Sequence, residues 1–244
     1  MAQDTAIKST SSQMLLSFNM KNIDTLFPGF MLGDFALMHG LSSVLPLSLL
    51  LAVKAQLPYQ LGGLESSAVF VDGGNTFQLY RTSRIARLNG LSPKKVLTRI
   101  FISRAFTAHQ MTAIILEKLE ETVKKFDAKI VILSDFTGLY LDKDIQPEEA
   151  KSIFTHVATY LSRFAEQAKV VVLATCPPHY YSRRNAFFHA VACSRSNVTI
   201  SIREKRLSCA GQQFVLEKHP LLRPGSVDFP SENLKLNDFD EADQ

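Results

Sequence analysis

Stretches of almost unbroken apolar residues alternate with longer amphipathic stretches along the chain, and this alternation restricts the fold more than any other feature. Continuous apolar runs are typical of strands buried on both faces, and amphipathic runs are typical of the helices that cover them. The expected strands are DFALMHG (34–40), SSAVFVDGG (66–74), VLTRIFISRA (96–105), AKIVILSDF (128–136), KVVVLATC (169–176), NVTISIRE (197–204) and QQFVLEKH (212–219). The expected helices span residues 43–56, 76–90, 107–126 and 146–168. The pattern predicts an α/β fold, a mostly parallel twisted sheet with helices on both faces.

Any binding site is expected along one edge of this sheet. Ligands of mostly parallel sheets bind just beyond the carboxyl ends of the strands. Those ends are Gly40, residues 72–75, residues 134–136 and residues 175–178.

The composition is that of one globular domain with loose ends. The chain has 244 residues, of which 46% are hydrophobic and 20% charged, and this is enough to bury a full core. Residues 1–13 are polar and rich in Ser and Thr, which predicts a flexible arm. Residues 231–244 are strongly acidic, which predicts a disordered tail. Residues 14–230 are expected to form the core domain.

Charge, cysteine spacing and hydropathy argue against several classes of protein. The formal net charge of +4 permits an anionic partner without requiring one. Cys176, Cys193 and Cys209 show no C-x-x-C spacing, so we expect reduced thiols, no metal site and no cofactor. The apolar run from Val44 to Val53 is too short to span a bilayer. We expect no membrane partner, and a cytoplasmic or nucleoid-associated location, or the nucleus in a eukaryote.

The stretch MHGLSSVLPLSLLLAVKAQLP (38–58) has the layout of a phosphate-binding loop, because a strand, a glycine, small polar residues and an apolar helix follow in order. Such a loop holds phosphates and magnesium with backbone N–H groups, a lysine and a Ser/Thr hydroxyl. Counted from Gly40, the second glycine position is Leu45, the lysine position is Pro46 and the hydroxyl position is Leu47. Pro46 has no N–H to donate. The stretch is therefore interpreted as a strand-to-helix turn without the groups that bind phosphate.

Five segments, in order, resemble the core of the RecA/RadA recombinase family. They are NIDTLFPGFMLGDFALMHG, LAVKAQLP, AVFVDGGNTFQLYRTSRIARLNGLSPKKVLTRIFISRAFTAHQM, KIVILSDFTGLY and FVLEKHPLLRPGSVDF. The resemblance spans about residues 18–229 and implies a RecA-like core. Because the chain has no counterpart of the family's N-terminal helical domain, it looks like a core-only RadA paralogue.

The resemblance also locates the positions that hydrolyse ATP in the family. A glutamate that polarises the attacking water lies two residues after an aspartate like Asp72, and here that place is Gly74. The Walker B aspartate position is Ser134, with Asp135 as its neighbour. Together with the changes in the phosphate loop, these replacements remove the charges that phosphoryl transfer needs. We expect a vestigial nucleotide site with no catalytic residues and no enzyme activity, although residual ATPase activity stays open.

Two segments correspond to the loops with which the family holds DNA. The first, YLDKDIQPEE (140–149), is net acidic and suits phosphate poorly. The second, PPHYYSRRNAFFHAVACSRSN (177–197), combines arginines with aromatic rings, a combination that binds single-stranded nucleic acid. The candidate DNA-binding residues, including the basic end of the next strand, are His179, Tyr180, Tyr181, Arg183, Arg184, Arg195, Arg203, Lys205 and Arg206. Alternatively, Phe187 and Phe188 are core residues on a short helix and the arginines only face solvent.

Three functions stay open at this point. The favoured one is a non-catalytic RadA-like paralogue that binds DNA, preferably single-stranded, and modulates homologous recombination or DNA repair. The second is a subunit that docks on a RadA-type recombinase or another paralogue without binding DNA, where Lys218 would offer a charge to a neighbour's ATP. The third is a divergent ATPase with relocated catalytic groups.

Overall fold

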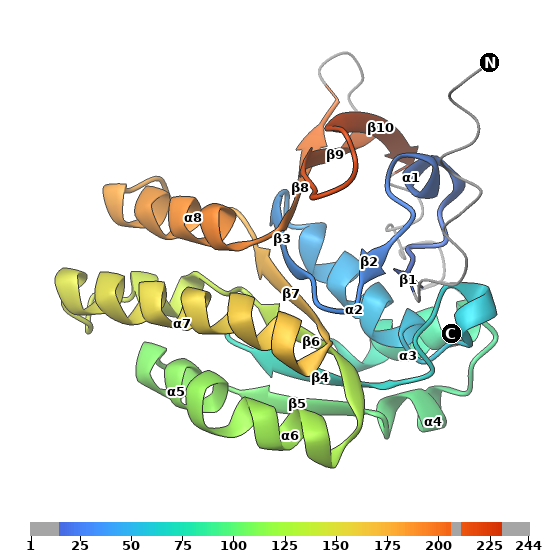
Figure 1. Ribbon diagram of the computed structural model, residues 1–244, viewed down its shortest axis with the longest axis horizontal. Coiled ribbons are helices and arrows are strands. Elements are labelled where there is room, and N and C mark those ends of the chain that lie inside the picture. The colour runs from blue at the N-terminus through green and yellow to red at the C-terminus, as the bar shows by residue number, and fades with distance from the viewer. Residues whose placement is uncertain (1–14, 206–210, 231–244) are drawn as a thin grey trace, which may run out of the picture.

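Eight strands form one sheet in the order β10-β9-β8-β3-β7-β6-β4-β5 (Figure 1). The structure, a computed structural model, describes residues 15–205 and 211–230. The strands are β3 (Phe35–Gly40), β4 (Ser67–Asp72), β5 (Ile100–Arg104), β6 (Ala128–Ser134), β7 (Val171–Cys176), β8 (Val198–Glu204), β9 (Gly211–Lys218) and β10 (Gly225–Pro230).

The six strands from β8 to β5 in this order run parallel, whereas β9 and β10 pair antiparallel at one edge. Parallel strands place all their carboxyl ends at the same edge of the sheet, and this edge therefore collects the ends of β3, β4, β6, β7 and β8. The α/β class and the mostly parallel sheet expected from the sequence are confirmed.

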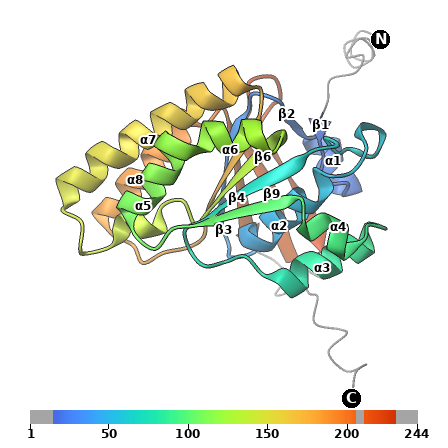
Figure 2. The same ribbon diagram turned by 90° about the horizontal axis from the view of Figure 1, so that it is seen from below.

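Helices cover both faces of the sheet, as Figures 1 and 2 show. One face packs against α2 (Val44–Lys54), α3 (Leu79–Leu88) and α4 (Pro93–Leu97), and the other against α5 (Ala108–Ala113), α6 (Leu119–Lys125), α7 (Pro147–Ala168) and α8 (Arg183–Arg195). Short 3-10 helices lie at η1 (Tyr59–Leu61) and η3 (Gly138–Leu141). Neighbouring residues of one strand face opposite sides, so that Met38 belongs to one apolar core and Leu37 to the other.

Helix α2 lies deep in the first of these two cores. Nine of its eleven residues are buried, and its side chains pack against residues of β3, β6 and β7. The two polar residues among the nine are satisfied, because Ser48 Oγ donates to Leu45 O and Lys54 Nζ donates to Asn89 Oδ1 at 2.9 Å. Burial lowers the pKa of Lys54 below its ordinary value. The helix is therefore a packing element along most of its length.

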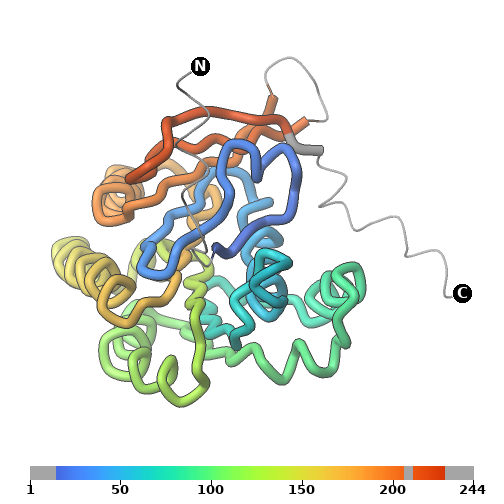
Figure 3. The backbone as a smooth tube through the Cα atoms, turned by 45° about the vertical axis from the view of Figure 1, so that its right-hand side comes forward, coloured from blue at the N-terminus to red at the C-terminus, as the bar shows by residue number. Residues whose placement is uncertain are grey.

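The N-terminal segment is held against the last strands by an aromatic cluster. It contains β1 (Leu15–Leu16), α1 (Lys21–Leu26) and β2 (Phe30–Met31), and it lies beside β9 and β10 in Figure 3. The rings of Phe18 and Phe214 are 5.5 Å apart, and those of Phe27 and Phe30 are 4.8 Å apart. All four rings are fully buried, so the cluster ties the two ends of the described chain together.

The structure corrects four details of the predicted elements. Residues 93–97 form the helix α4, so that only the second half of the expected strand 96–105 is extended. The expected helix 107–126 contains a π-helical turn, η2 (Ile114–Lys118), although Thr107 caps its start as expected. Strand β10 follows β9, which was expected to be the last strand.

The fourth correction concerns the segment 177–197, which was expected to be a DNA-binding loop. Residues 183–195 form helix α8, with Ser182 accepting a hydrogen bond from the backbone N–H of Asn185 as its N-cap. Phe188 is fully buried on this helix, whereas Phe187 stays 36% exposed. The helical alternative considered for this segment is thus right for Phe188, because its ring packs against Phe154 at 4.7 Å.

Several expectations lie outside the described residues. They concern the arm 1–13, the tail 231–244, Arg206 and Cys209. Within residues 15–205 and 211–230, no helix combines the length and the apolar character needed to cross a membrane.

We predict that Phe214→Ala lowers the free energy of unfolding by about 3–5 kcal/mol, because it removes the ring that joins the N-terminal segment to β9. Phe106→Ala is the matched control, since that ring is 67% exposed and its loss should change stability by less than about 0.5 kcal/mol. Urea denaturation of both variants measures the difference. Equal destabilisation would mean that the aromatic cluster does not hold the segment.

Candidate functional site

The turn between β3 and α2 is built around a close approach of two strands. Gly40 has a φ of 107°, and a Cβ at this position would lie 2.2 Å from the carbonyl oxygen of Ile202 on β8. Only glycine fits both the backbone angle and the contact. The N–H of Leu41 then donates to the same carbonyl at 3.0 Å. The turn is thereby held against β8 by a backbone hydrogen bond.

Backbone N–H groups of this turn are engaged inside the chain. The N–H of Val44 donates to Leu41 O, that of Leu45 to Ser42 O, and that of Leu47 to Ser43 O, at 3.1 to 3.2 Å. Pro46, the third residue of α2, has no N–H. The side chain of Leu47 is fully buried in the core. The positions that match the end of a phosphate loop therefore present apolar side chains and occupied amides.

Asp72, at the end of β4, organises the next turn. Its fully buried carboxylate accepts hydrogen bonds from the N–H of Thr76 at 2.8 Å and of Phe77 at 3.3 Å, and Arg104 lies 3.3 Å away. The hydroxyl of Thr76 also contacts Ser134, the Walker B position. Asp72 is thus bound by backbone and side-chain donors of the chain itself.

Asp135 fills the space beside Gly74. It follows the last residue of β6 with a left-handed φ of 52°, so its side chain does not continue the alternation of the strand. A Cβ at Gly74 would lie 2.8 Å from the Cβ of Asp135, and a Cβ at Gly138 would lie 2.4 Å from its Oδ2. The Asp135 Oδ1 atom lies 2.6 Å from Nε2 of His179. A carboxylate therefore sits next to the catalytic-glutamate position, and it is paired with a histidine.

A cavity of about 580 Å³ opens at the carboxyl ends of β3, β7 and β8. Its volume lies within the range of small-ligand sites. Residues from the sequence-predicted sets that line it are Gly40, His179, Tyr181 and Arg203. The fold thus brings part of the candidate nucleotide site and part of the candidate DNA site to one place.

Tyr181 lines this cavity, and together with its exposed neighbours in the chain, Tyr180 and Arg183, it forms what we call the rim. Tyr180 is 98% exposed and Tyr181 is 91% exposed. Arg183, the first residue of α8, is also exposed. Such rings and this charge are free to contact a ligand from solvent.

The other predicted basic residues are separated from this rim or engaged. Arg184 points inward, donating to the carbonyl of Ile145 and lying over the ring of Phe188. Arg195 is at the far end of α8, about 20 Å along the helix from Arg183. The described basic residues at the end of β8 and just after it have carboxylate partners, Glu217 for Arg203 and Asp228 for Lys205.

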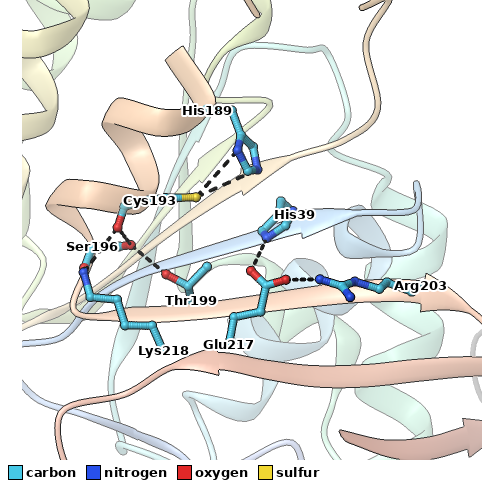
Figure 4. A network of polar contacts seen from close by, with 8 residues as sticks. All are labelled: His39, His189, Cys193, Ser196, Thr199, Arg203, Glu217 and Lys218. Carbon is cyan, nitrogen blue, oxygen red and sulfur yellow. Dashed lines mark hydrogen bonds and ion pairs between the residues drawn. The ribbon is translucent and has the colours of Figure 1, made fainter. Parts of the chain in front are cut away.

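A second cluster, which the sequence analysis missed, lies behind the same cavity. His39 on β3 and His189 and Cys193 on α8 each offer one ligand-type atom, and these atoms lie within 4.8 Å of one another (Figure 4). The sequence signal was the four-residue spacing of His189 and Cys193, which puts both on one face of a helix. His39 is 150 residues away from His189 in the chain, and only the fold joins it to them.

The electrostatics of this cluster follow from burial and from Glu217. Burial, followed by the Glu217 carboxylate, raises the pKa of Cys193 to about 11. Burial, followed by His39, lowers the pKa of His189. For Glu217, burial acts upward, but His39 and Arg203 outweigh it and hold the pKa below its ordinary value.

Lys218 belongs to the same network and closes the end of α8. Its Nζ donates to the carbonyl of Ser196 at 2.6 Å and to that of Cys193 at 3.3 Å. A cation at this position favours the carbonyl end of a helix. Within this chain Lys218 is therefore a helix cap, which differs from the trans-acting charge considered from the sequence.

Comparison with known proteins agrees with the fold. The sequence model of the Rad51 family matches residues 11–182, which ends one residue before α8 begins. A stretch of 118 residues is 37% identical to the DNA repair and recombination protein RadA of Aeropyrum pernix. The aligned stretch covers 48% of this chain and 34% of that protein. The chain therefore spans about a third of the length of this curated relative.

We predict that Gly74→Ala is destabilising, by about 1–3 kcal/mol, because the new methyl group overlaps the Asp135 side chain. In the Asp135→Gly background the same change should cost at least 1 kcal/mol less, roughly the coupling expected of residues in contact. A double-mutant cycle by urea denaturation measures this difference. The loss of the His179 contact cancels in the cycle, because it occurs in both variants that carry Asp135→Gly. Additive effects would contradict the account of how Asp135 fills this space.

Proposed function

Because this chain belongs to the Rad51 family of the RecA/RadA recombinases, we propose that it binds single-stranded DNA without hydrolysing ATP and thereby modulates homologous recombination or DNA repair. Two parts of the carboxyl edge of the sheet support this proposal. They are the β3–α2 turn, where the family holds ATP, and the cavity between β7, β3 and β8.

We base the proposed absence of ATP hydrolysis on the hydrogen bonds and residue types of the β3–α2 turn. Phosphate loops work because several N–H groups point at the phosphates. Here the N–H groups of Leu45 and Leu47 bond to carbonyls of the turn, and Pro46 has none. No lysine, hydroxyl or glutamate stands at the positions that match those serving the phosphates, the magnesium ion and the attacking water in the family.

The DNA-binding part of the proposal rests on the rim of the cavity. Single strands are held by rings that stack on bases and by cations that contact phosphates. Tyr180 and Tyr181 offer two almost fully exposed rings, and Arg183 stands two residues further on. The cavity beside Tyr181 has room for a base, and neither the rings nor the arginine depends on bound nucleotide.

We predict that Tyr180→Ala and Tyr181→Ala each weaken binding of single-stranded DNA by about 1–3 kcal/mol, the usual contribution of one stacked base. Tyr80→Ala is the matched control, because Tyr80 is 88% exposed on α3, on the other face of the sheet. Fluorescence anisotropy with a labelled oligothymidine measures the affinities. Unchanged affinity in both rim variants would show that no base stacks on Tyr180 or Tyr181.

We predict that Arg183→Ala lowers the salt dependence of the same binding by about 0.7 units of slope, the value for one phosphate contact on a single strand. Arg163→Ala controls for the loss of a positive charge. This arginine is exposed near the C-terminal end of α7 and is not among the predicted DNA-binding residues. Titration at several salt concentrations gives both slopes. Equal slopes for the two variants would mean that Arg183 contacts no phosphate.

We predict that calorimetry with Mg²⁺ and ATP detects no saturable binding up to millimolar nucleotide. Ser43→Ala is the informative variant, because its Oγ atom is buried in the turn without a hydrogen-bond partner. Micromolar affinity that is lost in this variant would place ATP in the β3–α2 turn and overturn the non-catalytic proposal.

Docking on a RadA-type recombinase is a second candidate function, favoured by α3. This helix exposes apolar surface at Leu79 (51%), Tyr80 (88%) and Leu88 (70%). Exposed large apolar side chains on one helix are a feature of protein contact surfaces. Tyr80→Ala together with Leu88→Ala should abolish co-purification with the recombinase and leave DNA binding intact, whereas an effect on DNA binding alone would exclude this role.

A further inference from the structure

The cluster of His39, His189 and Cys193 has the composition of a metal site. Imidazole nitrogen and thiolate sulfur are the donors that Zn²⁺ prefers. The three donor atoms converge from two elements, since His39 is the last residue but one of β3 while His189 and Cys193 lie one turn apart on α8. Both histidines also line the cavity, so an ion can enter from solvent.

The spacing of the donor atoms is close to that around a bound ion. Bond lengths of about 2.0–2.3 Å in a tetrahedral zinc site separate its donors by about 3.3–3.8 Å. Here all three atoms lie within 4.8 Å of one another, and Cys193 Sγ is already 3.6 Å from His189 Nδ1. Small rotations of the side chains would therefore complete the geometry.

Glu217 supplies the second feature that metal sites share. Its Oε2 atom lies 2.9 Å from Nε2 of His39, and its other oxygen contacts Arg203 (Figure 4). A histidine that binds a metal through one ring nitrogen usually gives the other to a carboxylate, which fixes the orientation of the ring. Glu217 therefore occupies the place of an orienting residue for His39.

We propose that His39, His189 and Cys193 bind one Zn²⁺ ion, with Glu217 orienting His39 and the fourth coordination position facing the cavity. The ion joins β3 to α8 and so fixes the helix whose first residue is Arg183. Nothing in this assignment depends on DNA binding, because none of the three ligands is among the residues Tyr180, Tyr181 and Arg183 that are proposed to bind DNA.

The test is zinc binding by the full, demetallated chain in competition with a chromophoric chelator. We expect one Zn²⁺ per chain, and Co²⁺ in its place should give a thiolate-to-cobalt charge-transfer band. Cys193→Ser should remove that band, and Cys193→Ser and His189→Ala should each weaken zinc binding more than about 100-fold, which exceeds the effect of changing a residue that only orients a ligand. Glu217→Gln should weaken it about 10–100-fold and keep the band.

Two control variants test whether zinc binds at this cluster or at other Cys and His side chains of the chain. Cys176→Ala removes another free thiol, which is buried, and His156→Ala removes an exposed histidine on α7; zinc affinity should stay within a factor of about 2 for both. Melting curves without metal show whether each variant is folded as well as the wild type. Absence of 1:1 binding by the wild-type chain, or equal affinity in the wild type and Cys193→Ser, would overturn the proposal.

Discussion

The parallel pairing of β3 with both β7 and β8 is the constraint on which the rest of this structure depends. Met38 lies opposite Thr175 on one side and Ile200 on the other. This pairing brings Gly40 so close to Ile202 that no side chain fits between them. It also collects the ends of three strands at one point, where the cavity opens and where residues of α8 line one side of it. The proposed DNA-binding residues and the proposed zinc ligands lie at or next to that point.

The carboxyl edge of the sheet is divided into two halves of different character. At the β3–α2, β4 and β6 ends, turn amides and carboxylates are bonded within the chain, with Asp72 bound by the turn after β4 and Asp135 packed against Gly74. At the β7 and β8 ends, rings and charges are exposed around a cavity. Polar groups that are already satisfied gain little from a ligand, whereas exposed rings and cations gain from stacking and phosphate contact. The proposed function therefore lies on the β7–β8 side of the edge.

Local sequence patterns were sufficient for most of the fold and for only part of the site. The buried strand AKIVILSDF could be predicted because its apolar residues form an almost continuous run. The long helix of residues 147–168 could be predicted because its apolar residues recur with the period of a helix. Helix α8 was considered only as an alternative, because its sequence mixes arginines and aromatic rings without a clear apolar stripe. The inward turn of Arg184 and the His39–His189–Cys193 cluster were not accessible in principle, since both depend on contacts between segments far apart in the chain.

The most direct test of the central claim is the affinity of the full chain for single-stranded DNA measured with and without Mg²⁺ and ATP under the same salt conditions. If binding rests on Tyr180, Tyr181 and Arg183 and the β3–α2 turn holds no nucleotide, the two dissociation constants agree within a factor of about 2, less than the tenfold change that 1.4 kcal/mol produces. A tenfold or larger tightening by ATP would contradict the account, because it would require a working nucleotide site coupled to the DNA-binding edge.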